Sequence, residues 1–298
     1  MKALVIGGTS GQVARQLSAL DDPDFMIQVG GRPDVDLSVP STLSSAILAA
    51  RPDVVINCGA YTAVDLAEKE RELADTINAS GPAVLGAICA AAGLPIIHLS
   101  TDYVFDGAKT SPYVETDFTG PQSVYGATKL GGEAAIAASG ARHVILRVSW
   151  VHAPEGKNFV RTMLRLAVSR DRVGVVADQI GRPTYAPHLA IALRDIAARL
   201  VIDPSAPTGV FHLTGSGEEC SWRQFAQAVF NASQVRGGPT AIADPIPTSG
   251  YPTPAKRPAN SVLDCTKIAK AYGIVLPDWK RGVEECVEAI RLNGWKIA

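Results

Sequence analysis

The sequence predicts an α/β protein in which a doubly wound parallel sheet is joined to a smaller C-terminal lobe. Three observations lead to this fold class. Short, continuously apolar segments alternate with helical patterns through the first half of the 298 residues. Such strands are typical of a parallel sheet that right-handed crossovers cover with helices on both faces. After Trp150 the alternation weakens, and proline- and glycine-rich segments indicate a second lobe.

Each element of the first half is inferred from its apolar pattern. The pair Gly81-Pro82 predicts a break in the longest helical pattern, because proline cannot donate a helical hydrogen bond. We expect strands at residues 2–7, 25–29, 53–57, 95–100 and 143–148, and helices at 11–20, 41–50, 67–92 and 124–138.

The second half is less regular. Ser221 is a suitable N-cap for the helical pattern that follows it. The stretch 237–258 is rich in proline and glycine, so a long loop is expected there. We expect helices at 158–169, 188–201, 221–231 and 279–293, an extended segment at 173–182 and a strand at 209–213 that returns to the sheet.

Composition and charge exclude several functional classes. The 28 basic and 29 acidic residues leave no basic excess for nucleic acid, and no basic amphipathic helix suggests a membrane surface. No stretch approaches the ~20 apolar residues of a membrane helix, and the N-terminal apolar run is too short for a signal peptide. The five cysteines are odd in number and scattered, which favours reduced thiols. We therefore expect a soluble, cytoplasmic protein.

A glycine-rich turn follows the first strand and opens the first helix. Gly8, Gly11 and Ala14 form G-x-x-G-x-x-A, with Gln12 and Val13 between them. Small residues at these positions let the backbone approach a pyrophosphate and let the helix pack on the strand. The strand–turn–helix context predicts a dinucleotide site and a Rossmann-type sheet. We assign dinucleotide binding to residues 1–150, with 187–214 returning to this part, and substrate binding to 151–186 and 215–298.

The residues after the second strand bear on the choice of cofactor. NAD-preferring sites place a carboxylate there for the ribose 2′-hydroxyl. This sequence has Arg32 instead, whose guanidinium suits a 2′-phosphate, with a solvated surface arginine as the alternative. Asp36 and Leu37 follow and can line the adenine pocket. We expect NADPH as the cofactor, with NADH possible.

Small residues follow the third core strand, where open α/β sheets bind ligands. Gly59, Ala60 and Tyr61 are expected to form walls against the cofactor, and Thr62 and Val64 to face the substrate. From the next strand, Leu99 is also assigned to the cofactor site.

Tyr125 and Lys129 form a Tyr-x-x-x-Lys motif that carries acid–base chemistry. Their i, i+4 spacing places both side chains on one helix face, where the lysine cation should lower the tyrosine pKa. Thr101 ends an earlier strand, where a hydroxyl can hydrogen-bond a substrate carbonyl beside the tyrosine. The three residues together predict a reductase that delivers hydride to carbon and a proton to oxygen.

The motifs of nearly the whole chain resemble the dTDP-4-dehydrorhamnose reductase family of extended short-chain dehydrogenases/reductases. The resemblance implies reduction of dTDP-4-dehydro-β-L-rhamnose to dTDP-β-L-rhamnose with NAD(P)H. It implies Thr101, Tyr125 and Lys129 as the catalytic triad. The segments that carry it are residues 11–13, 60–65, 100–107, 125–126, 129–133, 147–151, 158–160, 178–184 and 257–261.

The resemblance also implies that Asp102, Tyr103 and Trp150 surround the sugar, although Trp150 can instead be a core aromatic. Arg257, in the late loop, suits a nucleotide diphosphate, with a solvated loop charge as the alternative. Some family members form dimers bridged by magnesium held on acidic side chains, but the first helix here carries Arg15-Gln16, so no metal is expected. Cys58 and Gly59 depart from the alanines of many relatives. We expect a nucleotide-sugar substrate and a monomer or homodimer.

Two alternatives stay open. The first is another nucleotide-sugar enzyme, an epimerase or a dehydratase, although dehydratases of this type carry Asp-Glu after the threonine and here Tyr103 follows Asp102. The second is a non-catalytic, NADP-binding regulatory subunit, as in relatives that partner methionine adenosyltransferase.

Overall fold

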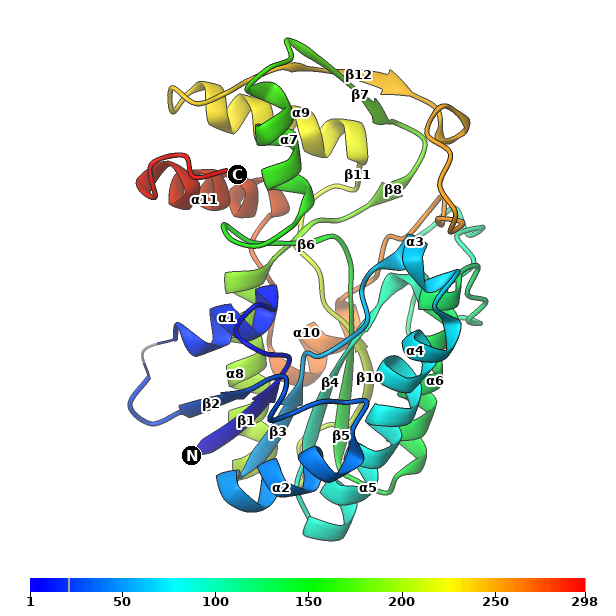
Figure 1. Ribbon diagram of the computed structural model, residues 1–298, viewed down its shortest axis with the longest axis vertical. Coiled ribbons are helices and arrows are strands. Elements are labelled where there is room, and N and C mark those ends of the chain that lie inside the picture. The colour runs from blue at the N-terminus through cyan, green and yellow to red at the C-terminus, as the bar shows by residue number, and fades with distance from the viewer. Residues whose placement is uncertain (21, 298) are drawn as a thin grey trace.

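The computed structural model describes residues 1–20 and 22–297. A six-stranded sheet has the order β10-β5-β4-β3-β1-β2, and every neighbouring pair is parallel (Figure 1). The order reverses between β1 and β3, as in doubly wound sheets. The predicted Rossmann-type fold is therefore confirmed. The strands are β1 Lys2–Ile6, β2 Met26–Gly30, β3 Val54–Asn57, β4 Ile96–Thr101, β5 His143–Val148 and β10 Gly209–His212.

Helices cover both faces of this sheet, and each face has its own buried core. On one face α1 (Gln12–Ser18) packs against α8 (Ala186–Ile202). On the other, α2 (Pro40–Ala50), α5 (Gly81–Ala92) and α6 (Val124–Ala138) form the second layer. The strands between the layers are apolar on both sides, which explains why they appear in the sequence as continuous apolar runs.

The predicted helix break at Gly81-Pro82 is wrong. The chain forms α3 (Val64–Ala67), and the helix is interrupted at residues 68–70. It then runs from α4 (Arg71–Asp75) through a π-helical turn (Thr76–Ser80) into α5. The π turn lies directly before Pro82, and its altered hydrogen bonding accommodates the missing proline N–H without ending the helix.

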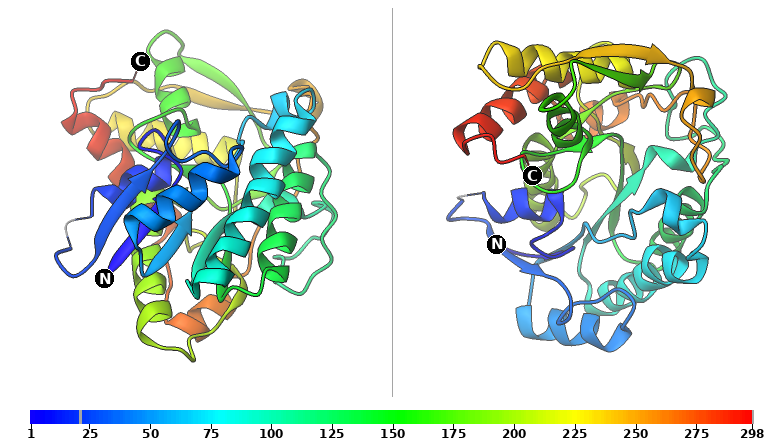
Figure 2. Two further views of the ribbon diagram at one scale, coloured as in Figure 1. Left: turned by 60° about the horizontal axis from the view of Figure 1, so that its bottom comes forward. Right: turned by 45° about the horizontal axis from the view of Figure 1, so that its top comes forward.

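A smaller lobe lies above the carboxyl ends of the sheet strands (Figures 1 and 2). Its core gathers aromatic and aliphatic side chains from three helices and from strands that lie far apart in the sequence. As predicted, Ser221 caps a helix, and it forms a full capping box with Gln224. The lobe contains α7 (Phe159–Ala167), β7 (Arg172–Val176), α9 (Trp222–Gln234), β12 (Ile242–Ile246) and α11 (Trp279–Leu292), and the short pairs β6 (Val151–His152) with β9 (Thr184–Tyr185) and β8 (Ile180–Gly181) with β11 (Cys220–Ser221).

Two other elements differ from expectation. The stretch 237–258 is not wholly a loop, because β12 pairs in parallel with β7 and a 3-10 turn follows at Thr248–Gly250. Pro245 lies within β12 and hid the strand, although proline is tolerated at the edge of a two-stranded sheet. Helix α10 (Thr266–Tyr272) was not expected; it packs beside β10, and its Ile268 is buried in the sheet core.

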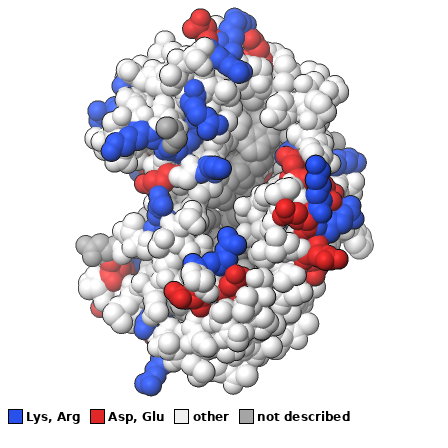
Figure 3. Space-filling model, viewed as in Figure 1, with Lys and Arg blue, Asp and Glu red and all other residues white. Residues whose placement is uncertain are grey.

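The surface is hollowed between the sheet and the smaller lobe (Figure 3). The carboxyl ends of β1, β3 and β4 point toward the smaller lobe (Figure 1). Within the described ranges, no helix is long and apolar enough to cross a bilayer.

Candidate active site

Thr101 and Tyr125 meet where a strand ends and a helix begins. Thr101 is the last residue of β4, and Tyr125 lies in the first turn of α6. Ser123 caps that helix by accepting a hydrogen bond from the N–H of Gly126 at 3.2 Å. Thr101 is the neighbour whose side chain acts to lower the pKa of Tyr125, against the larger effect of burial. The structure thus brings together the hydroxyl and the phenol that the sequence singled out.

Asp102 and Tyr103 extend this cluster. The Thr101 hydroxyl donates to Asp102 Oδ1 at 2.9 Å and accepts the N–H of Tyr103 at 3.2 Å. Burial raises the pKa of Asp102 to about 6, with hydrogen bonds from Ser261 and Thr101 acting in the opposite direction. The ring of Tyr103 meets the Tyr125 ring edge-on, with centroids 5.6 Å apart. Both residues lie beside Thr101 and Tyr125, and their contact with a sugar stays a prediction.

The expected lowering of the Tyr125 pKa is not seen. Burial raises the pKa of Tyr125 to about 12, and its hydrogen bond with Thr101 offsets only part of this effect. Asp102 adds to this rise, and Lys129 is not among the groups that shift the pKa of Tyr125. The amino group of Lys129 lies at the strand, where Lys129 Nζ donates to the carbonyl oxygen of Leu99 at 2.6 Å. Tyr125 is therefore held in its protonated form, which suits a proton donor.

The glycine-rich turn fits a dinucleotide. Gly7 and Gly8 have φ angles of +148° and +68°, which side-chain-bearing residues rarely adopt. A Cβ at Gly11 would lie 3.0 Å from the carbonyl oxygen of Gly7, so a larger residue there would crowd this tight turn. Gln12 Oε1 is buried in the protein alone without a hydrogen-bond partner, and a bound cofactor could supply a donor to it. Val13 points into the core, so only its backbone can face a ligand.

Three further cofactor candidates cluster around the end of β2. Arg32 is exposed directly after this strand. The carboxylate of Asp36 accepts from the backbone and hydroxyl of Ser38. Burial opposes its charge, but these hydrogen bonds and Arg32 together lower the pKa of Asp36. Leu37 packs so closely on Gly59 that a Cβ there would be 2.9 Å from Leu37 Cδ1.

A buried amide holds the next wall of the crevice. Asn78, on the π turn, accepts the N–H of Tyr61 at 2.8 Å and donates to its carbonyl oxygen at 3.1 Å. The same amide donates to Thr128 Oγ1 at 3.1 Å, next to Lys129. Gly59 and Ala60 precede Tyr61 in this wall, and the exposed Thr62 and the half-buried Val64 follow it.

Arg257 lies beside the predicted substrate side, but its guanidinium is already paired. Its Nη1 and Nη2 donate to the two oxygens of Asp65 at 2.9 and 2.8 Å, and Nη1 also donates to Thr253 and Ala255. The ion pair fastens the late loop to α3, which carries Val64. Arg257 is thus both a candidate phosphate ligand and a structural tie.

Trp150 belongs partly to the core of the smaller lobe. Its ring stacks on Trp222 with centroids 3.6 Å apart, and its backbone has a φ of +48°. Gly181 allows this packing, because a Cβ there would lie 2.6 Å from the indole. The half-buried indole therefore takes the core role left open by the sequence, and contact with a sugar stays a prediction.

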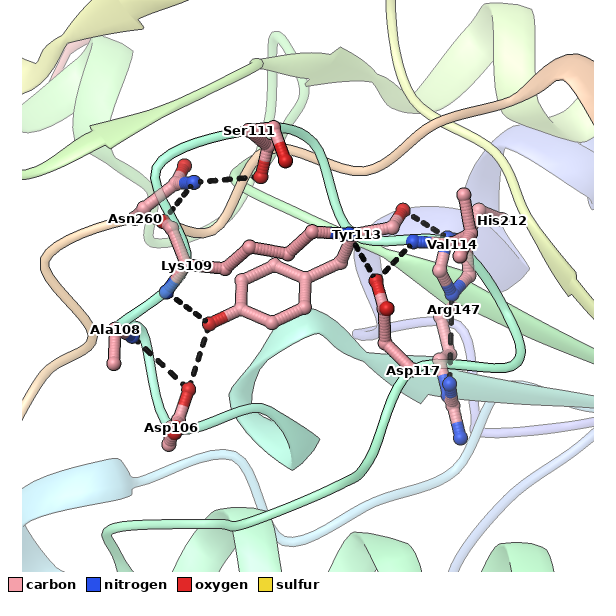
Figure 4. A network of polar contacts seen from close by, with 10 residues as sticks. All are labelled: Asp106, Ala108, Lys109, Ser111, Tyr113, Val114, Asp117, Arg147, His212 and Asn260. Carbon is pink, nitrogen blue, oxygen red and sulfur yellow. Dashed lines mark hydrogen bonds and ion pairs between the residues drawn. The ribbon is translucent and has the colours of Figure 1, made fainter.

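The segment between Thr101 and Tyr125 is pinned by a polar network around Tyr113 (Figure 4). The Tyr113 hydroxyl donates to Asp106 at 2.7 Å and accepts the N–H of Lys109 at 3.1 Å. Asn260, from the late loop, donates to the carbonyl oxygen of Lys109 at 2.7 Å. His212 links the network to the sheet through the carbonyl oxygen of Tyr113 at 3.1 Å. This network ties the segment between Thr101 and Tyr125 to the late loop and to the sheet.

Four residues near the site were missed by the sequence argument. Arg147 forms a buried ion pair with Glu133 at 2.6 Å, and Glu133 also accepts from Ser100 at 2.5 Å. His98 and Asn57 lie beneath Lys129 and are fully buried. A single histidine or asparagine in an apolar strand carries no spacing signal, so nothing in the sequence distinguished them.

Comparison with known proteins shows which family the chain resembles over nearly its whole length. The model of the RmlD substrate binding domain matches residues 1–292. A dTDP-4-dehydrorhamnose reductase of Sinorhizobium fredii is 47% identical over 293 residues, with 98% of each chain covered. One from Burkholderia thailandensis is 44% identical and covers 96% of this chain and 98% of its own.

Solved structures show the same likeness. A dTDP-4-dehydrorhamnose reductase of Clostridium acetobutylicum has a TM-score of 0.89 at 35% identity, covering 98% of this chain and 100% of its own. The Bacillus anthracis enzyme, in complex with NADP, has a TM-score of 0.87 at 31% identity, covering 96% and 98%. The chain therefore belongs to the family of the RmlD substrate binding domain, together with these dTDP-4-dehydrorhamnose reductases.

Proposed function

We propose that this protein reduces the 4-keto group of dTDP-4-dehydro-β-L-rhamnose to give dTDP-β-L-rhamnose, with NADPH as the hydride donor and NADH as a possible substitute. The meeting of Thr101, Tyr125 and Lys129 at the carboxyl end of β4 carries the proposal. The NADP bound to the Bacillus anthracis relative supports the cofactor. We place the reaction in the cytoplasm, in a monomer or homodimer.

Thr101, Tyr125 and Lys129 have separate roles in this reaction. When bound, NADPH supplies the hydride that goes to the carbonyl carbon. Thr101 turns its hydroxyl from Asp102 to the substrate oxygen, and Tyr125 donates its phenolic proton to the same oxygen. The charge left on Tyr125 is stabilised by the Lys129 cation and removed by a proton from solvent. In the net reaction, the ketone, NADPH and one proton are converted to the alcohol and NADP.

We propose that residues 1–150 with 187–214 bind the dinucleotide, while the smaller lobe binds the nucleotide sugar. The glycine turn on the sheet side supports the first assignment. Arg257, which reaches α3 from the lobe side of the hollow, supports the second.

The decisive experiment is turnover by the purified chain alone. NADPH absorbance should fall when dTDP-4-dehydro-β-L-rhamnose is added, and dTDP-β-L-rhamnose should form in equal amount. A non-catalytic regulatory subunit would bind NADPH without consuming it. An epimerase or dehydratase would change the sugar without net loss of NADPH and would retain its cofactor through purification. Either of these results would contradict the proposal.

A further inference from the structure

A buried chain of polar side chains runs beneath Lys129 and plays no part in the chemistry described so far. Asn57 and His98 are opposite each other in the register of β3 and β4, so their side chains lie on one face of the sheet. Asn57 Nδ2 is 3.0 Å from His98 Nδ1, and His98 Nε2 is 3.4 Å from Lys129 Nζ. Both residues are fully buried.

One backbone N–H decides the hydrogen-bond directions of the whole chain. Asn57 Oδ1 accepts the N–H of Gly59 at 3.0 Å, and a backbone N–H can only donate. The asparagine amide is therefore oriented with Nδ2 toward His98. Because Nδ2 donates, His98 Nδ1 must accept. Burial and the charge of Lys129 lower the pKa of His98 well below its usual value, so the ring is neutral and carries its one proton on Nε2.

The Nε2–H of His98 therefore points at the amino group of Lys129. An ammonium has no lone pair to accept that N–H, whereas a neutral amine has one. Lys129 already donates to the carbonyl oxygen of Leu99 on the same strand. Helix α6 lies close to His98, since a Cβ at Gly132 would be 3.4 Å from His98 Nε2. The imidazole thus stabilises the uncharged lysine relative to the ammonium.

We propose that Asn57 and His98 are positioning residues that hold Lys129 in place and set how firmly it keeps its proton. This role rests on the reductase function proposed above. It also connects the wall of the cofactor crevice, through the Gly59 N–H, to the charge on Lys129. Asn57 and His98 are closed off from solvent, so they cannot pass a proton between solvent and Lys129. The proton that restores Tyr125 therefore enters from the cleft side.

Other groups around Lys129 also shift its pKa. Burial lowers the pKa of Lys129 to about 8, while Glu133 on the same helix and Cys58 after β3 act to raise it. Glu133 is itself paired with Arg147 of β5, and Tyr125 lies one turn away on α6. Among these neighbours His98 is the one whose effect depends on which ring nitrogen carries the proton.

The first test reads the tautomer directly. Long-range proton–nitrogen correlation spectra of histidine-labelled protein, assigned with a His98→Phe variant, should show His98 protonated on Nε2 alone and unchanged from about pH 6 to pH 9. A proton on Nδ1, or titration near the ordinary histidine pKa, would overturn the proposal. This measurement needs no turnover, so it separates failure of this inference from failure of the proposed function.

The second test reverses the tautomer. In Asn57→Asp the carboxylate can accept from both Gly59 and His98 Nδ1, so His98 Nε2 becomes an acceptor for Lys129. The alkaline limb of kcat/KM for ketosugar reduction, where Lys129 loses its proton, should move up by about one pH unit. The same substitution in a His98→Phe background should move it clearly less. Equal shifts in both backgrounds would show that the new charge acts directly and that His98 has only a structural role.

Discussion

Tyr125 is the residue on which the proposed chemistry depends most directly. Burial raises its pKa to about 12, so at neutral pH it is fully protonated and ready to donate. Lys129 is not needed to keep Tyr125 protonated before the reaction. It is needed to stabilise the phenolate that remains after the proton has left, and this role explains why the two residues share a helix face.

The Tyr125→Phe variant tests the proton donor. It keeps the ring and its edge-on contact with Tyr103 but removes the hydroxyl. General acid catalysis contributes roughly 10²–10⁴-fold, so kcat for the ketosugar nucleotide should fall by about that factor. NADPH binding, measured by fluorescence titration, should change little. A kcat near that of the wild type, with chemistry shown to limit turnover, would rule out Tyr125 as the donor.

Arg32 bears on the choice between the two cofactors. Arg32 is exposed directly after β2, and no acidic residue lies between the end of that strand and Arg32. We therefore expect Arg32→Ala to raise KM for NADPH more than KM for NADH. Only NADPH carries the 2′-phosphate. Steady-state kinetics with each cofactor gives the comparison, and equal changes in the two KM values would show that Arg32 does not contact that phosphate.

Arg257 has two candidate roles, and a matched pair of variants separates them. Loss of a charge-assisted hydrogen bond costs roughly 1.5–3 kcal/mol, so Arg257→Ala should weaken nucleotide-sugar binding about ten- to a hundred-fold. Asp65→Asn breaks the ion pair but leaves the guanidinium. If Arg257 binds the diphosphate itself, calorimetry should show affinity retained in Asp65→Asn. Equal losses of nucleotide-sugar affinity in the two variants would show that Arg257 acts only by holding the late loop against α3.

At the scale of elements, the site depends on how closely α6 approaches its neighbours. Gly126 and Gly132 both lie on this helix where another backbone comes near. A Cβ at Gly126 would be 2.2 Å from the carbonyl oxygen of Tyr103, and one at Gly132 would be 2.2 Å from that of Asn78. These glycines let the helix bring Tyr125 and Lys129 to the strand ends.

The adjacent glycines of α6 provide a matched test of this approach. Glycine to alanine inside a helix ordinarily stabilises by about 1 kcal/mol. Gly132→Ala should instead lower the free energy of unfolding, because the new methyl meets backbone. Gly131→Ala, whose Cβ would meet only the Ala79 side chain at 3.1 Å, should be much better tolerated. Urea unfolding of both variants makes the comparison, and equal stabilities would contradict the close approach.

At the scale of the whole molecule, buried histidines link stability to pH. Burial lowers the pKa of His152 to about 4 and that of His212 to about 3, and it lowers the pKa of His98 well below its usual value. The unfolded chain binds these protons near pH 6.5, whereas the folded chain does not. Their contribution is therefore fully present above pH 6.5 and is lost as the pH falls. Asp102, whose pKa is raised to about 6, opposes this loss by binding one proton on folding.

The expected result is an early loss of stability in acid. Three protons taken up on unfolding, less the one held by folded Asp102, give a net slope of about 3 kcal/mol per pH unit between about pH 6 and pH 4.5. Urea unfolding across this range measures the slope. His152→Gln should reduce it by about one proton, or about 1.4 kcal/mol per pH unit. A flat profile in the wild type would mean that the histidines are protonated in the folded state.

The sequence alone determined the α/β class, the parallel sheet and the three residues of the proposed triad. These features depend on local patterns: continuous apolar strands, a glycine turn at positions 7–11 and an i, i+4 pair at Tyr125 and Lys129. Each pattern lies within about one helical turn or one strand, so the chain carries it without reference to the rest of the fold.

Only the tertiary structure decided what surrounds those residues. Pro82 continues a helix because a π turn precedes it, and Pro245 lies in a strand because β12 is itself an edge strand of a two-stranded sheet. Arg257 is paired because Asp65, almost two hundred residues away, lies against it. The direction of the Lys129 amino group follows from His98 and Leu99 of β4. These outcomes depend on contacts between distant segments, whose energies no local pattern contains.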